Sequence, residues 1–454
     1  MDQGIGATAI DARAGTARLH PRRFYILALL LLVSILNFVD RSVISVLVEP
    51  IRHDLQLSDS QMGFLTGTAF ALTYVTMVIP AARLADRWSR PKVIALAMLT
   101  WSIMTMLCGA AKSGTQLFLA RFGVGFGEGG STPSSQAMVS DLFPRSQRSA
   151  ALAVLALCSP LGTALGLSFG DWALKAFDWR TTFLLAGVPG LVLLPLVLFT
   201  IPNVPKGHSD AIAAPPPTPS LVRTIPILWR IRTFRYLVLA SATQTVLSAG
   251  LPFWLPAFLQ RSHHMAKGTA GTPLGLAMAA GLVIGSLAGG PLSEWLGRRD
   301  MRRQLWLGIA TSLLSGSSAA AAFLVPGDAV FLLLGMMSFF GGIFTGPLFG
   351  ISLTLAPVAA RATASACMLV IINLTAIGLG PLVVGRLSDW LHPSFGEESL
   401  RAALLCVTLI ALPAASFFWL ASRSYRGDMA AAAKRDRELG EGRKPGRRDA
   451  RTAP

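Results

Sequence analysis

The chain of 454 residues is 52% hydrophobic and only 14% charged, whereas an average soluble domain has about 25% charged residues. Its apolar residues form blocks of about 20, the length that crosses a hydrocarbon core of roughly 30 Å as a helix. The alternating ten-residue segments of a membrane β-barrel are absent from the sequence. These features exclude a soluble globular protein and predict an all-α, polytopic membrane protein.

Twelve apolar blocks, in chain order, predict twelve transmembrane helices. They cover residues 24–48, 62–84, 93–111, 115–139, 149–173, 181–201, 234–260, 273–296, 304–325, 329–357, 363–390 and 400–422. A proline-rich stretch at 214–219 is incompatible with helix and separates the sixth block from the seventh. The expected organisation is a cytoplasmic N-terminal segment (1–23), a six-helix bundle (24–201), a cytoplasmic linker (202–233), a second six-helix bundle (234–422) and a basic cytoplasmic tail (423–454).

The net charge of +17 follows this predicted topology and does not indicate a nucleic-acid partner. Arginine and lysine gather before the first and seventh blocks and after the second, fourth and eighth, which share one side if the chain crosses twelve times. The positive-inside rule places that side and both termini in the cytoplasm, as expected for a multi-pass protein of the inner (cytoplasmic) membrane. The tail is predicted to be disordered and to contact anionic lipid headgroups, at about 1 kcal/mol per basic residue.

Two blocks carry charges where an isolated spanning helix has none. Asp40 and Arg41 lie in the first block, and Arg121 and Glu128 lie in the fourth. Each such group costs roughly 2.5–3.5 kcal/mol near the bilayer centre, so these residues usually face a partner or a watered cavity and mark a transport pathway. Arg121 and Glu128 share one helix face about 10.5 Å apart, too far to pair directly within an ideal helix.

Other polar or aromatic residues in the blocks are candidates to line a cavity. They are Asn37, Thr132, Gln244, Phe253, Trp254 and Asn373. For the polar residues, an interhelical hydrogen bond is the alternative; for the two aromatic residues, the preferred interpretation is the belt at the membrane surface. The four cysteines, Cys108, Cys158, Cys367 and Cys406, lack metal-binding spacing and are expected to be small buried residues. No enzyme, metal or cofactor motif stands out.

Two internal repeats indicate a duplicated six-helix unit. The first is an acid followed by an aromatic residue and arginine, at Asp86 and again at Glu294, 208 residues later. The second is an Asp-Trp pair that ends the fifth and eleventh blocks, at Asp171 and Asp389, 218 residues apart. Similar offsets at separate places are typical of secondary transporters built from repeated halves.

The chain resembles the major facilitator superfamily over nearly its whole length, and residues 37–148 resemble the spinster branch of lipid transporters. The spinster-like features are Asp40-Arg41, Asp86-Arg87 with Ser89-Arg90, the run from Arg121 to Glu128, Pro133, Asp141-Leu142-Phe143-Pro144 and Arg148. The resemblance implies two six-helix bundles around a central cavity and transport by alternating access.

The resemblance also implies that the first and fourth spans are neighbours, so that Asp40 meets Arg121 and Glu128 meets Arg41. We hypothesise that this cluster binds a proton at Glu128 or Asp40 and that its arginines contact an anionic substrate group. The alternative is a salt-bridge network that only locks two helices together. The residues expected to gate the cytoplasmic side are Asp86, Arg87, Arg90, Asp141, Arg148, Glu294 and Arg298. Ordinary positive-inside anchoring is the alternative for these.

The expected function is secondary active transport of an amphiphilic lipid, such as a lysophospholipid or a sphingolipid-like molecule, with protons as the coupling partner and the chain acting as a monomer. A small organic-anion or multidrug transporter is the alternative. A membrane receptor or scaffold without transport is disfavoured, because the paired charges and repeated loops would then have no role.

Overall fold

The computed structural model describes residues 21–204, 221–357 and 360–441, and every regular element in these ranges is helical. The first half contains α1 (Arg23–Val46), α2 (Val48–Leu55), α3 (Asp59–Gly63), η1 (Phe64–Thr68), α4 (Ala69–Arg87), α5 (Arg90–Gly109), α6 (Gly114–Glu128), α7 (Ser131–Leu142), α8 (Arg145–Ala156), α9 (Cys158–Ala176) and α10 (Trp179–Thr200). The second half contains α11 (Leu221–Arg230), α12 (Arg232–Thr245), η2 (Val246–Gly250), η3 (Leu251–Trp254), α13 (Leu255–Ser262), α14 (Gly271–Gly297), α15 (Arg302–Leu324), α16 (Ala329–Ile343), α17 (Thr345–Leu355), α18 (Arg361–Asn373), η5 (Leu374–Leu379), α19 (Gly380–Phe395), η6 (Gly396–Glu398), α20 (Ser399–Thr408) and α21 (Ala411–Glu441).

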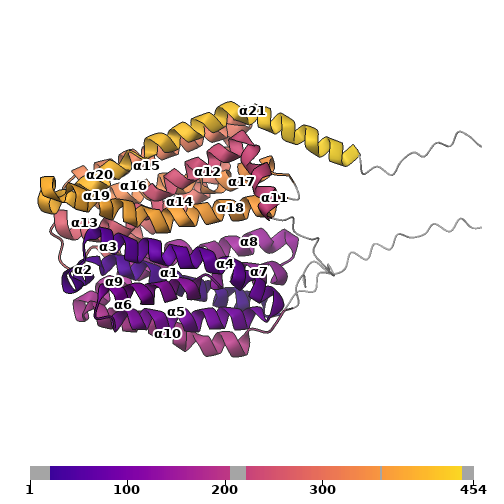
Figure 1. Ribbon diagram of the computed structural model, residues 1–454. Coiled ribbons are helices and arrows are strands. Elements are labelled where there is room, and N and C mark those ends of the chain that lie inside the picture. The colour runs from indigo at the N-terminus through magenta and orange to yellow at the C-terminus, as the bar shows by residue number, and fades with distance from the viewer. Residues whose placement is uncertain (1–20, 205–220, 358–359, 442–454) are drawn as a thin grey trace, which may run out of the picture.

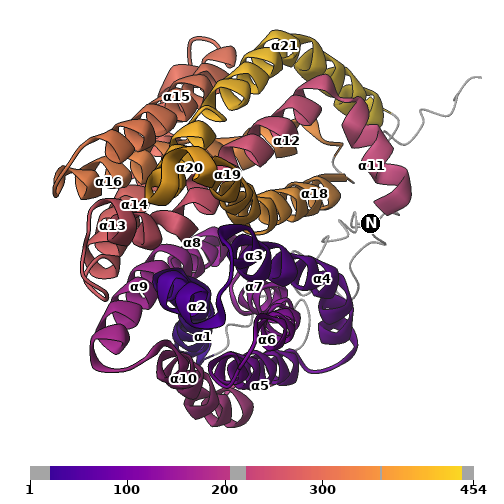
Figure 2. The same ribbon diagram turned by 60° about the vertical axis from the view of Figure 1, so that its left-hand side comes forward.

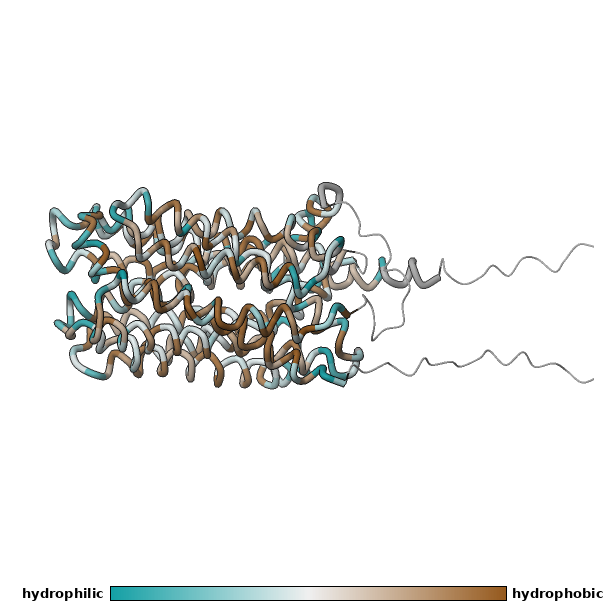
Figure 3. Tube along the Cα trace, turned by 90° about the horizontal axis from the view of Figure 1, so that it is seen from below, coloured by the Kyte–Doolittle hydropathy of each residue, from teal (hydrophilic) through white to brown (hydrophobic). Residues whose placement is uncertain are grey.

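The helices form two bundles that lie side by side, one from each half of the chain (Figures 1 and 2). Apolar residues dominate the middle of the helices and hydrophilic residues concentrate at both ends (Figure 3). Ten described stretches are long and apolar enough to cross a membrane, and the last, residues 363–435, contains both of the final predicted spans. The fourth predicted span is present as two shorter helices, α6 and α7. The prediction of a polytopic protein with twelve spans in two six-helix bundles is confirmed.

Three spans are interrupted by π-helical turns. The elements η1, η2 and η5 are π-helical turns within the second, seventh and eleventh spans, and such turns are frequent at functional sites. The Thr68 hydroxyl donates to the Gly378 carbonyl at 2.8 Å, and the Thr245 and Thr375 hydroxyls lie 3.0 Å apart. The π turns therefore lie in a polar, hydrogen-bonded contact between spans.

Two close helix contacts join the halves at the end opposite the chain termini: α3 and η1 pack on α19, and α9 packs on α14 (Figures 1 and 2). Glycine makes both contacts possible. A Cβ on Gly67 would lie 2.7 Å from the carbonyl oxygen of Ile377, in the η5 turn that leads into α19, and one on Gly271 would lie 2.7 Å from that of Leu167. The backbones are thus too close for a larger residue without displacement of a helix.

The structure corrects two expectations, one for the C-terminal tail and one for Cys406, and it adds a helix to the linker. The first part of the predicted disordered tail is helical, since α21 continues to Glu441; its alanine-rich run favours helix, and Asp428 accepts a 2.7 Å hydrogen bond from the Thr233 backbone N–H. The predicted linker contains helix α11. Cys406 is exposed rather than buried. The expectations for residues 1–20, 205–220 and 442–454 lie outside the described residues.

Candidate functional site

A buried cluster of four charged residues joins α1 to α6. The Arg41 Nε atom donates to Glu128 Oε2 at 2.5 Å, and Arg121 Nη1 lies 3.8 Å from Asp40 Oδ2. These are the two pairs that the sequence analysis expected. The exposed fractions are 4% for Asp40, 1% for Arg121 and 0% for Glu128, so the charges depend on one another rather than on bulk solvent.

Neighbouring side chains fix the geometry of this cluster. The Thr105 hydroxyl of α5 donates to Asp40 Oδ1 at 2.7 Å. The Arg41 guanidinium lies 4.5 Å from the centre of the Tyr74 ring and 5.1 Å from that of Phe70, within the range of cation–π attraction. Two aromatic rings and the Glu128 carboxylate thus contact Arg41, and the four charges sum to zero.

Unsatisfied atoms remain inside the cluster. Arg41 Nη2, Glu128 Oε1 and Asp40 Oδ2 are buried without a hydrogen-bond partner, as are Nε and Nη1 of Arg121. Buried polar atoms without partners are unfavourable and usually indicate an exchangeable occupant such as water, an ion or a ligand. The cluster therefore has unused hydrogen-bonding capacity for a proton or an incoming polar group.

The other cavity candidates divide into two groups. Asn37 and Thr132 line a pocket of about 470 Å³ beside the cluster. Gln244 is half-buried, and its Oε1 atom has no partner. In contrast, one amide N–H of Asn373 donates to the Leu369 carbonyl of its own helix at 2.8 Å, so part of its hydrogen-bonding capacity is used within the helix.

The aromatic candidates belong to the protein interior and not to a belt. Trp254 is 0% exposed, and its indole N–H donates to the Pro381 carbonyl at 2.9 Å. The ring of Phe253 packs edge-on against it, with centroids 5.6 Å apart. The belt interpretation of Trp254 is wrong because a carbonyl at the start of α19 supplies the partner that the membrane interface would otherwise supply.

We expect Trp254→Phe to destabilise the protein by about 2 kcal/mol, because it removes this hydrogen bond and part of a fully buried ring. The measurement is the midpoint of thermal unfolding of detergent-purified protein, followed by loss of the monodisperse peak in size-exclusion chromatography. Trp295→Phe is the matched control, because Trp295 is 63% exposed on α14. Equal midpoints for the two variants would contradict a role of Trp254 in packing.

At the end that carries the chain termini, the first-half gating candidates pair within their own half. Arg90 forms an ion pair with Asp141 and donates to the Ala137 carbonyl at 3.1 Å. Arg148 donates to the Phe143 carbonyl at 3.4 Å, and Arg87 is exposed. The side chain of Asp86 lies outside the described residues. These contacts tie α5, α7 and α8 together.

The second-half candidates do not bridge different helices. Arg298 and Glu294 form an exposed pair on α14, 3.3 Å apart, because a spacing of four residues places them on one helix face. The acid that connects two helices here is Asp300, which Arg426 of α21 contacts at 2.9 Å. Hydrogen bonds from the Arg302 backbone N–H and from Arg426 lower the pKa of Asp300 below its usual value. The sequence analysis did not single out Asp300 or Arg426.

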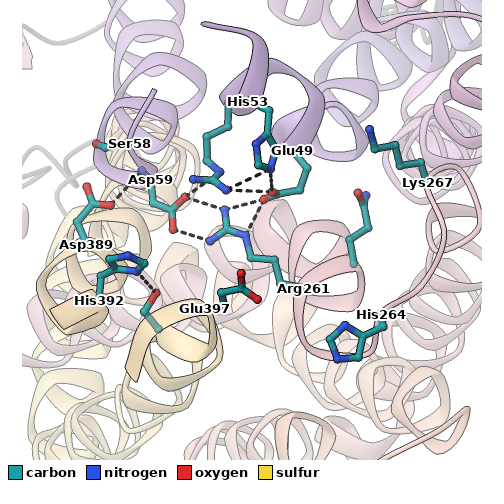
Figure 4. Close-up of a pocket in the computed structure, with 13 residues that line it drawn as sticks. Glu49, His53, Ser58, Asp59, Arg261, His264, Lys267, Asp389, His392 and Glu397 are labelled. Carbon is teal, nitrogen blue, oxygen red and sulfur yellow. Dashed lines mark hydrogen bonds and ion pairs between the residues drawn. The ribbon is translucent and has the colours of Figure 1, made fainter. Parts of the chain in front are cut away.

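The opposite end carries an ionic contact between the halves that sequence reasoning missed (Figure 4). Arg261 of α13 contacts both oxygens of Asp59, at 2.7 and 2.8 Å, and Glu49 Oε1 at 2.7 Å. Asp59 also accepts a 2.7 Å hydrogen bond from Ser388 of α19. The ion pairs of Arg261 with Glu49 and Asp59 cross between the halves. They lie in a pocket of about 680 Å³.

The repeated Asp-Trp pairs supply two further connections at this end. Asp389 accepts hydrogen bonds from the backbone N–H groups of Asp59 and Ser60 at the start of α3, at 3.1 and 2.9 Å. Asp171 accepts one from the Thr272 N–H at the start of α14, at 2.6 Å. Each aspartate therefore caps a helix of the other half, where a carboxylate is favoured by the helix dipole. We call these two contacts the aspartate clasps.

The family model described as the Major Facilitator Superfamily matches residues 30–381. The chain belongs to this superfamily. Its members are transporters and not enzymes, which agrees with the sequence analysis.

Two proteins of similar sequence and one solved structure indicate which members of the superfamily this transporter resembles. An MFS-type efflux pump of Mycolicibacterium smegmatis is 38% identical over 90% of this chain and 95% of its own. Protein spinster homolog 3 of Danio rerio is 26% identical over 92% and 88%. The crystal structure of a bacterial homolog of the human lysosomal transporter Spinster, in an inward-facing and unoccupied conformation, superposes with a TM-score of 0.81 at 28% identity, over 90% of this chain and 98% of that one. The transporter thus resembles the spinster family.

Proposed function

We propose that this transporter moves an amphiphilic lipid, a lysophospholipid or a sphingolipid-like molecule, across the inner membrane in exchange for or together with protons. The observation that carries the proposal is the buried cluster of Asp40, Arg41, Arg121 and Glu128. Its two carboxylates and two guanidiniums are almost fully buried, pair across α1 and α6, and sum to zero charge.

Charge balance links proton binding to substrate binding in this cluster. A proton on Glu128 removes the partner of Arg41 and leaves a net charge of +1 in a low-dielectric interior. An unpaired buried charge is strongly unfavourable, so the arginine then attracts an anionic substrate group. The planar guanidinium suits a phosphate because it donates two parallel hydrogen bonds. Protonation and headgroup binding therefore favour each other.

The apolar second half supports an acyl chain rather than a sugar as the remaining part of the substrate. Helices α15, α16 and α17 contain no acidic residue. A sphingosine-1-phosphate transporter of Xenopus tropicalis, 26% identical over 52% of this chain and 45% of its own, supports the same substrate class. In this proposal the headgroup of the lipid binds at the charged cluster in the first half and its acyl chain lies along the second half.

The distribution of contacts supports an inward-facing state with both termini in the cytoplasm. Arg261 and the aspartate clasps close the end opposite the termini, and the basic loops favour the cytoplasm for the other end. The similar solved structure is itself inward-facing. In this proposal the clasps are the extracytoplasmic gate, which opens in the other half of the transport cycle.

Flux measurements in proteoliposomes test the proposal. We expect radiolabelled lysophosphatidic acid to cross liposomes that contain the protein, and an imposed pH gradient to increase the rate. Protein-free liposomes correct for spontaneous lipid movement. Lipid transport that does not depend on the pH gradient would contradict proton coupling. Absence of lipid transport by folded protein would contradict a lipid substrate.

A multidrug or organic-anion exporter is the second candidate, because the relative named as an efflux pump is 38% identical over most of both chains. A cationic dye and a small organic anion in the same liposome assay distinguish the candidates. Gradient-driven dye or anion movement without lipid movement favours the exporter and leaves the fold and the charged cluster unchanged.

A further inference from the structure

A second, uncharged pocket lies in the first half beside the charged cluster. Its volume is about 470 Å³. The described residues that line it come from α1, α7, α8 and the start of α9, and none of them is charged. Among them are hydroxyl and amide side chains of Asn37, Thr132, Ser135 and Gln136, together with Cys158. The pocket is thus built for hydrogen bonds without charge.

Two of these side chains have no partner although they are buried. Asn37 is 2% exposed, and neither its Oδ1 nor its Nδ2 atom makes a hydrogen bond; Ser135 is 0% exposed and its hydroxyl is also unpaired. Buried polar groups in proteins are usually paired. By comparison, Ser34 in the same pocket is satisfied by the Leu30 carbonyl at 2.8 Å. The unused donors and acceptors point to an exchangeable polar occupant.

The position of the pocket relates it to the charged cluster. Asn37 precedes Arg41 by four residues on α1, which places it on the same helix face about 6 Å along the axis. Ser135 follows Glu128 by seven residues across the break between α6 and α7. A molecule with an anionic group at Arg41 would therefore present the adjacent part of its headgroup to Asn37 and Ser135.

We propose that Asn37 and Ser135 form a subsite that recognises a free hydroxyl group next to the anionic group of the substrate. The Asn37 amide offers one unpaired acceptor and a donor, and the Ser135 hydroxyl offers both, which complements a hydroxyl that donates and accepts at once. The subsite favours a single-chain lipid that retains its glycerol hydroxyl over a lipid in which that hydroxyl is absent or esterified. This inference rests on the proposed lipid transport.

Cys158 makes the pocket testable through binding alone. The experiment treats purified protein with N-ethylmaleimide and measures alkylation of each native cysteine by peptide mass spectrometry. The probes are 1-oleoyl lysophosphatidic acid and its 2-deoxy analogue, which differ only in the hydroxyl. Cys406, exposed on α20, is the internal control for effects of lipid on reagent access. We expect the hydroxylated lipid to protect Cys158 at about tenfold lower concentration than the deoxy analogue, since a site built for a hydroxyl disfavours its absence.

Substitution of the subsite should remove this discrimination. In Asn37→Leu the two lipids should protect Cys158 at equal concentrations, near that of the deoxy analogue in the parent protein. Ser135→Ala, which removes a single oxygen atom, is the replacement variant for the same measurement if Asn37→Leu does not fold. Equal protection by both lipids in the parent would overturn the hydroxyl subsite. Lipid flux without any protection of Cys158 would overturn the subsite but not the proposed function, whereas absence of both flux and protection would overturn both.

Discussion

Replacement of Glu128 by glutamine should abolish accumulation of lipid driven by a pH gradient. The amide is nearly isosteric and its oxygen still accepts the Arg41 hydrogen bond, now 2.5 Å long, but it cannot exchange a proton. For one proton per substrate, a gradient of about one pH unit supports an accumulation ratio of about ten. The variant should give a ratio of about one while it still equilibrates lipid downhill. The measurement is uptake into proteoliposomes with and without the imposed gradient.

Asp328→Asn is the matched control for this experiment. Asp328 is an exposed carboxylate before α16 that makes no side-chain cap, so its neutralisation should leave accumulation intact. If Glu128→Gln retained the accumulation ratio of the parent protein, the buried cluster would be a lock between α1 and α6, and the coupling role would have to be abandoned.

Loss of Arg261 should open the end of the protein opposite the termini. Arg261→Ala leaves Glu49 and Asp59, 6% and 5% exposed, with the longer ion pairs to Arg52, at 3.5 and 3.9 Å. Removal of one partner of a buried ion pair is destabilising, and because Arg52 still balances part of the charge we expect a loss of about 1.4 kcal/mol, a tenfold change in the ratio of closed to open states. Spin labels at His53 and Lys267, which line the pocket from opposite halves (Figure 4), should report a longer distance by double electron–electron resonance.

Arg180→Ala is the control for this second variant. Arg180 pairs with Asp54 at 2.6 Å, and both residues belong to the first half, so removal of this pair should not change the distance between labels. Arg261→Lys should give a mixed distribution, since an ammonium cannot make the two parallel hydrogen bonds to Asp59. A distance in Arg261→Ala equal to that of the parent would show that the aspartate clasps and helix packing close this end without the arginine.

The charged cluster could be predicted because charges in apolar spans are rare and need partners. The sequence marked Asp40, Arg41, Arg121 and Glu128 individually, and a spacing of seven residues excluded a direct pair within one helix. The choice of partners required α1 and α6 to be neighbours, which came from the family resemblance and is present in the structure. The neighbours Thr105 and Tyr74 were not predictable, since a single hydroxyl or aromatic residue in a span is common.

The contacts at the end opposite the termini could not be predicted for a different reason. Glu49, Asp59 and Arg261 lie near the ends of apolar blocks, where charged residues are ordinary and carry no signal of their own. The Asp-Trp repeat did carry a signal, because it recurs at a similar offset in both halves. The repeat showed that Asp171 and Asp389 correspond, but not that each caps a helix of the opposite half.

The amino-acid sequence by itself determined the class of the protein, its spans, its two related halves and the residues that are costly in a membrane. These properties depend on hydrophobicity along the chain, which is local. Only the tertiary structure decided that Trp254 is buried with its N–H bonded to the Pro381 carbonyl and that Arg298 pairs with Glu294 of the preceding turn. It also decided that Arg261 joins the two halves. These properties depend on which helix faces meet, because a charge or an indole N–H takes the nearest partner that packing provides.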